Sequence, residues 1–240
     1  KPETMVNAHG GTLDLGTYKI TDDKPLGMIP FTAALEYSSN IVFSTVALEM
    51  PDAKLYKYVR EFGFGLTSGI DLPGELPGKT RKIEEFDEPT KRFLGFGYGI
   101  ATTPLQILNA YAAIANGGQM MKPYMIEEIQ DADGKALKSF QPEKVRRVVS
   151  EKTAETLTDM LCNVVERGTG QNARLAGIRI AGKTGTSQQL VDAEYSKQAY
   201  NASFVGYFPA DDPKVAILVL LDKPKGDYHG GAVAAPIFAN

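Results

Sequence analysis

The apolar residues of this chain change their period once, and this change constrains the fold more than any other feature. In four segments between residues 32 and 168, they recur every three or four positions, which is the spacing of an amphipathic helix. Beyond Gly177, Ile178 and Ile180 alternate with other residue types, and two strongly apolar runs follow at 202–208 and 215–221. Such alternation is typical of β-strands. Helices followed by about three antiparallel strands predict an α+β fold.

Start and stop residues divide the helical part of the sequence. They predict helices at about 32–50, 52–62, 104–116 and 151–167, with a Gly/Pro-rich loop at 63–78 and a weakly stranded opening segment at 1–30. Asp52 can cap the second helix, Thr103-Pro104 opens the third and Ser150 opens the fourth. The polar triplet Ser38-Ser39-Asn40 interrupts the first. We therefore expect this triplet at a junction between two helices.

Charge and composition exclude several classes of protein. The 240 residues contain 26 Lys and Arg against 29 Asp and Glu, giving a net charge of −3 and a pI near 5.5. This balance, without a basic stripe, argues against a nucleic-acid partner. The longest apolar run, 215–221, is too short to cross a bilayer. One cysteine, Cys162, and two distant histidines, His9 and His229, favour neither a disulfide framework nor a metal site, and no cofactor is expected.

One run matches a nucleotide-binding pattern by its letters alone. Gly177-x-x-x-x-Gly182-Lys183-Thr184 fits the P-loop, which needs a buried strand before the first glycine and a helix after the lysine. Residues 172–176 do not have the pattern of a buried strand, and Gly185 occupies the position where the helix would begin. Nucleotide binding therefore stays a distant alternative.

Two further short motifs are more informative as a pair than separately. A triplet such as Ser38-x-Asn40 arises about once by chance in a chain of this length, so its default interpretation is a polar break between helices. The run Lys183-Thr184-Gly185-Thr186 is much rarer, and it follows alternating residues, where glycine permits close approach of a ligand backbone. Their occurrence in this order, about 145 residues apart, makes the pair a stronger signal than either motif alone.

These motifs and their surroundings resemble the penicillin-recognising serine transpeptidases that cross-link peptidoglycan, specifically the class B penicillin-binding proteins. The resemblance covers nearly the whole chain. The matching stretches are 35–40, 62–65, 67–75, 97–106, 115–118, 168–170, 181–186 and 203–209. The loop after the second helix and the start of the third helix are more similar to the division-type branch than to the elongation branch.

The resemblance assigns roles to both motifs. The implied catalytic residues are Ser38, Asn40 and Lys183, and the implied substrate-binding residues are Thr184, Gly185 and Thr186. On the helical side, Ser38 would relay a proton towards the leaving amine. Asn40 would hydrogen-bond the substrate backbone and help to hold an active-site lysine.

On the strand side, the implied roles concern charge and substrate binding. Lys183 would raise the local positive potential, and the hydroxyls of Thr184 and Thr186 would bind the substrate carboxylate. The Thr186 backbone N–H would form half of an oxyanion hole. Gly185 would keep the strand edge open for the substrate backbone.

The family's nucleophile motif, Ser-x-x-Lys, does not occur in this sequence. No serine has a lysine three positions later; the serines are Ser38, Ser39, Ser44, Ser68, Ser139, Ser150, Ser187, Ser196 and Ser203. In the family the motif lies upstream of Ser-x-Asn, farther back than Lys1. We therefore expect residues 1–240 to be an incomplete transpeptidase domain that neither turns over substrate nor retains a covalent penicillin, although its parent protein does.

The resemblance also implies a setting for the domain. It implies a β-lactamase-like antiparallel sheet with helices, truncated at both ends, because the family's first strands lie upstream and its closing helix follows Asn240. Exposed edges at 202–208 and 215–221 would favour dimers or aggregation. The implied partners are peptidoglycan stem peptides, β-lactam antibiotics, and division or elongation membrane proteins. The parent would be anchored in the cytoplasmic membrane with this domain on the periplasmic or extracytoplasmic side, whereas this piece itself would be soluble.

Other functions stay open at this point. The chain as a degenerate, non-catalytic peptide-binding module is the main alternative, and the upstream reading frame would distinguish it from an enzyme. A class A β-lactamase needs an additional glutamate for deacylation, and no glutamate here lies in a recognisable context for that role. His229 beside Gly230-Gly231 is interpreted as a turn residue, with a place at the substrate rim as the alternative.

Overall fold

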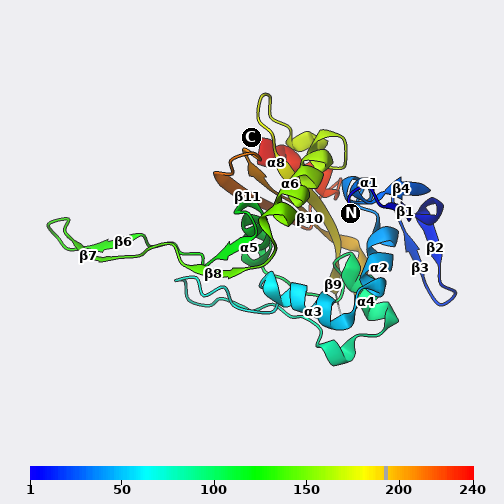
Figure 1. Cartoon of the computed structure of the whole chain (residues 1–240), viewed down its shortest axis with the longest axis horizontal. Coiled ribbons are helices and arrows are strands. Elements are labelled where there is room, and N and C mark those ends of the chain that lie inside the picture. The colour runs from blue at the N-terminus through cyan, green and yellow to red at the C-terminus, as the bar shows by residue number, and fades with distance from the viewer. Residues whose placement is uncertain (192–193) are drawn as a thin grey trace.

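The main sheet is antiparallel and three-stranded. A computed structural model describes residues 1–191 and 194–240. The sheet consists of β9 (Ala181–Val191), β10 (Glu194–Phe208) and β11 (Val215–Asp222), in the order β11-β10-β9 (Figure 1). In the hairpin of β10 and β11, Ala202 pairs with Leu221 and Phe208 with Val215. This is the hairpin expected from the two apolar runs, so the prediction of an α+β fold with about three antiparallel strands is confirmed. The expected exposed edge at 202–208 is wrong, because β10 is the central strand and pairs with both β9 and β11.

The start of β9 differs from the prediction. The alternation of Ile178 and Ile180 indicated a strand from about residue 178, but β9 begins at Ala181. Leu175 and Ile178 instead form an isolated antiparallel bridge around Gly177, whose φ is +75°. Glycine adopts this left-handed conformation without steric cost, so the chain closes a tight turn where alternation alone indicated a strand.

Helices of the predicted order surround the sheet. They are α1 (Phe31–Glu36), α2 (Asn40–Glu49), α3 (Asp52–Glu61), α4 (Glu88–Gly95), α5 (Pro104–Ala115), α6 (Glu151–Glu166), α7 (Gly230–Val233) and α8 (Ala235–Ala239). α5 begins with a capping box, in which Thr103 accepts from the Gln106 N–H and Gln106 accepts from the Thr103 N–H. Asp52 is the first residue of α3 and not its cap, because Pro51 occupies the cap position.

Several short elements complete the fold. Four two-stranded ribbons pair β1 (Met5–Asn7) with β4 (Met28–Pro30), β2 (Thr12–Asp14) with β3 (Lys19–Thr21), β5 (Gln119–Met121) with β8 (Lys144–Arg147), and β6 (Glu128–Gln130) with β7 (Ala136–Ser139). The 3-10 turns are His9–Gly11, Ile83–Glu85 and Gln171–Ala173. The first two ribbons agree with the weakly stranded opening segment. The β6–β7 ribbon extends away from the body of the molecule (Figure 1).

Helix α4 was not predicted, although its start carries a helix signal. Asp87 caps α4 by accepting from the Thr90 N–H, and Pro89 lies in its first turn. α4 packs against α2. The buried Lys91 side chain donates to the carbonyl oxygens of Leu48 and Met50 at 2.9 and 2.8 Å, which fixes α4 at the end of α2.

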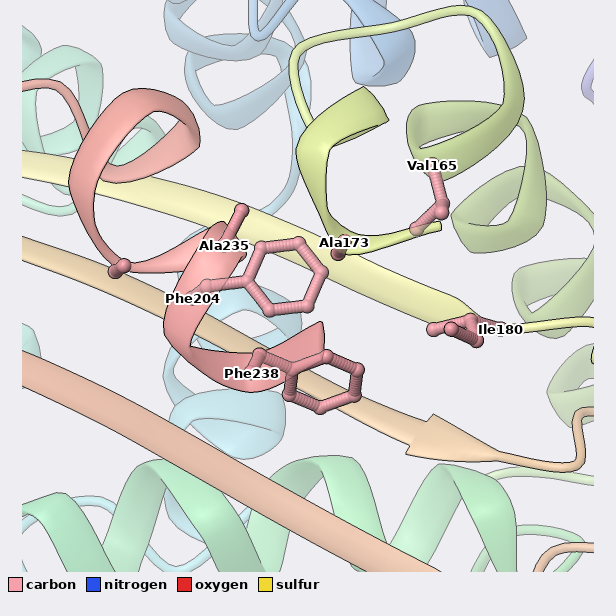
Figure 2. Close-up of a cluster of buried hydrophobic side chains, with 7 residues drawn as sticks. Val165, Ala173, Ile180, Phe204, Ala235 and Phe238 are labelled. Carbon is pink, nitrogen blue, oxygen red and sulfur yellow. The ribbon is translucent and has the colours of Figure 1, made fainter. Parts of the chain in front are cut away.

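A buried cluster joins the sheet to the last helix. Phe204 of β10 is fully buried, and its ring meets that of Phe238 of α8 edge to face, with centroids 4.8 Å apart. Figure 2 shows Val165 of α6, Ile180 and Ala235 lining the same cluster. Burial of large aromatic rings supplies much of the stability of a domain. This cluster holds α6, α8 and β10 in one unit.

The opposite face of β10 packs against α5. Side chains alternate across a strand, so Tyr207 points away from the Phe204 cluster. Tyr207 is fully buried together with Leu161 and Cys162 of α6, and Tyr111 and Ile114 of α5 pack against this group. The Tyr207 hydroxyl lies 2.6 Å from the Thr158 hydroxyl, so its polar end is satisfied. The sheet is therefore covered on both faces.

Membranes and metal ions are the subject of two absences among the residues that the structure describes. In residues 1–191 and 194–240, no helix is both long and apolar enough to cross a membrane. The same residues contain no group of three or more His, Cys, Asp or Glu side chains that could hold a metal ion.

Candidate active site

The Ser38-Ser39-Asn40 triplet lies between α1 and α2, as predicted. Ser39 caps α2 by accepting from the Val42 N–H at 3.2 Å. Ser38 has a φ of +58°, which is the left-handed region. For a residue with a Cβ this conformation costs of the order of 1–3 kcal/mol and persists only where surrounding contacts hold it. The surrounding contacts therefore hold the Ser38 backbone in a strained conformation and fix the direction of its side chain.

The carboxylate of Asp22 holds the C-terminal side of this turn. It accepts from the Ser39 hydroxyl at 2.5 Å and from the Ile41 N–H at 3.1 Å. The Asn40 side-chain amide donates to the carbonyl oxygen of Thr21 at 3.0 Å. Because Asp22 directly follows β3, these bonds fix the start of α2 against the β2–β3 ribbon.

Ser38 and Lys183 meet directly although 145 residues separate them in the chain. The Lys183 ammonium donates to the Ser38 hydroxyl at 2.8 Å and to the carbonyl oxygen of Thr184 at 3.0 Å. Burial lowers the pKa of Lys183 from 10.5 to about 8. At neutral pH the lysine is still mainly protonated, so a positive charge lies beside the Ser38 oxygen.

The motif on β9 presents two hydroxyl groups. The Thr184 hydroxyl lies 2.6 Å from that of Thr169, in the turn after α6. The Thr186 hydroxyl accepts from the Gly230 N–H at the start of α7, at 3.1 Å. Because a hydroxyl that accepts still carries its own proton, Thr186 can donate to an anionic group. Among the described strands, β9 pairs with β10 alone, so it forms one edge of the main sheet.

Gly185 meets a steric requirement within the sheet itself. It pairs with Ser203 of β10, and a Cβ at position 185 would lie 2.5 Å from the Ser203 side-chain oxygen. The predicted reason for this glycine was access of a substrate backbone to the strand edge. The structure adds a second reason, because a side chain here would collide with Ser203.

A cavity of about 980 Å³ lies over the two motifs. Ser38, Asn40, Thr184 and Thr186 line it. Lys183 is not among the lining residues, but it contacts Ser38, which is. The structure therefore brings the predicted helical and strand residues together on one concave surface.

Aromatic side chains line part of this cavity. The lining aromatics are Phe93, Phe96, Tyr98, Tyr195, Tyr200, Tyr228 and His229. The rings of Tyr200 and Tyr228 stack with centroids 4.1 Å apart, and His229 stacks on Tyr228 at 4.5 Å. The Asp227 carboxylate lies 2.8 Å from His229 Nδ1. His229 thus lies at the cavity rim as well as at the start of α7.

Most of these aromatic residues received no role from the sequence. Tyr98 lies in a stretch that matched the family, and so does Thr169, but neither received a role. Tyr195 and Tyr200 of β10 and Tyr228, before α7, belong to no motif that could have marked them. Their association depends on the fold.

The P-loop interpretation is wrong. Lys183 and Thr184 lie within β9, where the backbone is paired with β10. A phosphate-binding loop needs free backbone N–H groups that converge before a helix. Here the residues after Thr184 continue the strand, so no phosphate cradle exists at this position.

Comparison with known proteins identifies the family. The model of the penicillin binding protein transpeptidase domain matches residues 1–240. The chain therefore belongs to the penicillin-binding transpeptidase family, and the predicted family and fold class are confirmed.

Individual relatives agree with this assignment. Stage V sporulation protein D of Bacillus subtilis is 38% identical over 216 residues, covering 89% of this chain and 33% of the relative. Peptidoglycan D,D-transpeptidase FtsI of Escherichia coli K12 is 32% identical over 224 residues, covering 92% of this chain and 36% of the relative. The chain thus spans about a third of the length of the curated relatives it matches.

Solved structures show the same fold. Penicillin-binding protein 3 of Mycobacterium tuberculosis, complexed with aztreonam, superposes with a TM-score of 0.89 at 32% identity, covering all of this chain and 56% of that one. The transpeptidase domain of Burkholderia pseudomallei penicillin-binding protein 3 gives a TM-score of 0.88 at 31% identity, covering all of this chain and 70% of that one.

Proposed function

We propose that this chain forms the proton-relay and carboxylate-binding part of a serine D,D-transpeptidase site that cross-links peptidoglycan stem peptides. The observation that carries the proposal is the 2.8 Å bond between Lys183 and Ser38, which joins the helical wall to the edge strand beneath one cavity. The names of the relatives support the reaction class.

The helical wall handles the proton in this proposal. Acyl transfer from a D-Ala-D-Ala peptide needs a proton for the leaving amine. The Ser38 hydroxyl, held by the Lys183 ammonium, relays that proton. The Asn40 amide lines the cavity and hydrogen-bonds the substrate backbone.

In this proposal, residues of the edge strand bind the substrate carboxylate and the developing oxyanion. The proton of the Thr186 hydroxyl points to the substrate carboxylate while its oxygen accepts from Gly230, and the Thr184 hydroxyl adds a second donor. The Lys183 charge strengthens both interactions because the lysine is partly shielded from bulk water. The Thr186 backbone N–H stabilises the developing oxyanion.

The nucleophile and general base come from residues outside these 240 in our proposal. No serine of this chain has a lysine three positions later. Without both groups, only binding interactions remain, so the 240-residue chain alone forms no covalent penicillin adduct. The longer protein binds β-lactams covalently at an upstream Ser-x-x-Lys serine.

The names of the relatives support a proposed cellular setting. We propose a division-type role for the longer protein, because similar proteins include FtsI of Escherichia coli and PbpB of Mycobacterium tuberculosis. In this proposal it is anchored in the cytoplasmic membrane, acts on the extracytoplasmic side and assembles with division membrane proteins. Among the described strands, β11 pairs with β10 alone, and a second copy at that edge would form a dimer.

Intact mass spectrometry after incubation with a penicillin tests the proposed function. The protein extended upstream to its natural start should gain one penicillin mass, mapped to an upstream serine, and the 240-residue chain should gain none. Ser38→Ala should slow formation of the adduct, whereas Ser68→Ala, in the Gly/Pro-rich loop, should not. If the folded full-length protein forms no adduct, the hypothesis of a transpeptidase is refuted and a degenerate peptide-binding module is favoured.

A further inference from the structure

A bidentate ion pair links the end of α1 to the end of α6, next to the proposed site. Arg167 donates from Nε to Glu36 Oε2 at 3.0 Å and from its terminal nitrogen to Glu36 Oε1 at 2.8 Å. The two residues are 131 positions apart in sequence. Only 4% of the Glu36 side chain is exposed, against 58% for Arg167. A nearly buried carboxylate is therefore neutralised by an arginine at the surface.

The backbone strengthens the same contact. The Thr169 N–H donates to the carbonyl oxygen of Glu36 at 3.0 Å. A Cβ on Gly168 would lie 2.3 Å from that oxygen, so the approach of the two segments requires a glycine. Glu36 is thus bound to the turn 167–169 through both its side chain and its main chain.

This contact closes a ring of interactions through the site. Glu36 lies two residues before Ser38, whose hydroxyl meets Lys183. On the other side, Thr169 lies two residues after Arg167, and its hydroxyl meets that of Thr184. The two sides of the ring therefore end on β9 at adjacent motif residues, Lys183 and Thr184. A shift of α1 relative to the 167–169 turn would therefore change the Ser38–Lys183 distance.

The strained backbone of Ser38 makes such a restraint necessary. Its φ of +58° is unfavourable for serine and persists only where the flanking residues are fixed. Asp22 holds the C-terminal flank through Ser39 and Ile41. On the N-terminal flank, Glu36 is fixed by Arg167, and the Lys24 ammonium lies 4.3 Å from the centroid of the Tyr37 ring.

We propose that Glu36 and Arg167 are positioning residues that hold the Ser38 hydroxyl against Lys183 and in register with Thr184. Neither residue lines the cavity, so they act through Ser38 and not on the substrate. This inference rests on the proposed function, since it assigns the pair to the acyl-transfer site.

The first test compares two arginines in the full-length protein. Arg179 is a matched control, because it also bridges two carboxylates, those of Asp159 and Asp211 at 2.7 and 2.6 Å, but lies outside the cavity lining. We expect Arg167→Gln to slow penicillin acylation between about tenfold and about a hundredfold, as displacements near 1 Å do. Arg179→Gln should stay within about twofold. Equal losses in both variants would overturn the proposal.

A double-mutant cycle separates positioning from general stability. If the pair acts through Ser38, Arg167→Gln adds no further loss of acylation rate in a Ser38→Ala background. Multiplicative losses would mean that the pair acts independently of Ser38 and would overturn the proposal. Glu36→Gln, which preserves the shape of the side chain, replaces Arg167→Gln in the cycle if the latter does not fold.

A crystal structure of full-length Arg167→Gln gives a readout that does not depend on acylation. We expect the Ser38 hydroxyl to move beyond hydrogen-bond range of Lys183, farther than about 3.5 Å. An unchanged Ser38–Lys183 bond would overturn the positioning role. If the wild type forms no adduct, the proposed function fails by itself, and this distance still decides the positioning role.

Discussion

The partly buried charge of Lys183 should make the protein less stable at neutral pH than a variant without it. The pKa of Lys183 falls from 10.5 to about 8 because burial disfavours the ammonium. A pKa shift of this size corresponds to about 3 kcal/mol. The folded state is destabilised by this amount at any pH at which Lys183 is protonated. We therefore expect Lys183→Met to remove a destabilising charge and to relieve part of this cost at pH 7.

The sign of the pH dependence follows from linkage. Below pH 8 the lysine is protonated in both states, so the full cost is present. Between pH 8 and 10.5 the unfolded state binds more protons than the folded state, so stability rises with pH. The stability difference between Lys183→Met and the wild type should therefore shrink by about 2–3 kcal/mol from pH 7 to pH 10. Lost hydrogen bonds to Ser38 and Thr184 enter at both pH values and largely cancel in this comparison.

Reversible urea unfolding at pH 7 and pH 10 measures this double difference. Lys57→Met is the control, because Lys57 is exposed on α3 and its ammonium stays in water. The control should show no comparable change between the two pH values. If the stability difference between Lys183→Met and the wild type is the same at pH 7 and pH 10, the lowered pKa of Lys183 is refuted.

Three further substitutions test contacts that hold the site. Gly168→Ala brings a Cβ to 2.3 Å from the Glu36 carbonyl oxygen, so the unfolding free energy should fall by about 1–3 kcal/mol in urea titration. Phe204→Ala leaves a cavity in the core and should lower stability by about 3–5 kcal/mol, seen as a reduced Tm. Asp22→Ala leaves the buried Ser39 hydroxyl without its acceptor, so stability should fall by about 1–3 kcal/mol and penicillin acylation of the full-length protein should slow. An unchanged unfolding midpoint would count against the contact concerned.

Local signals predicted the order of elements and several of their boundaries. Thr103 and Ser150 cap α5 and α6 as expected, because a cap needs only the backbone N–H groups of the next turn. The apolar runs at 202–208 and 215–221 formed the expected hairpin, because strand alternation depends on which face is buried. α4 was missed although Asp87 and Pro89 carried the same kind of signal as Thr103 and Pro104.

The two motifs were also readable from the sequence, but their geometry was not. Residue type and order indicated Ser38, Asn40 and the run 183–186. The left-handed φ of Ser38 and its bond to Lys183 depend on contacts from Asp22 and Arg167, which lie in other parts of the chain. The start of β9 was not readable from the sequence either. It lies at Ala181, because Leu175 and Ile178 form a local bridge where strand pairing was expected.

By itself, the sequence determined the α+β order, the helix caps, the hairpin and the family to which the chain belongs. Tertiary structure decided the shape of the cavity, its aromatic lining, the lowered pKa of Lys183 and the Glu36–Arg167 pair. The physical reason is the range of the interactions. Caps and periodicity act between residues a few positions apart, whereas burial and ion pairing depend on segments that only folding brings together.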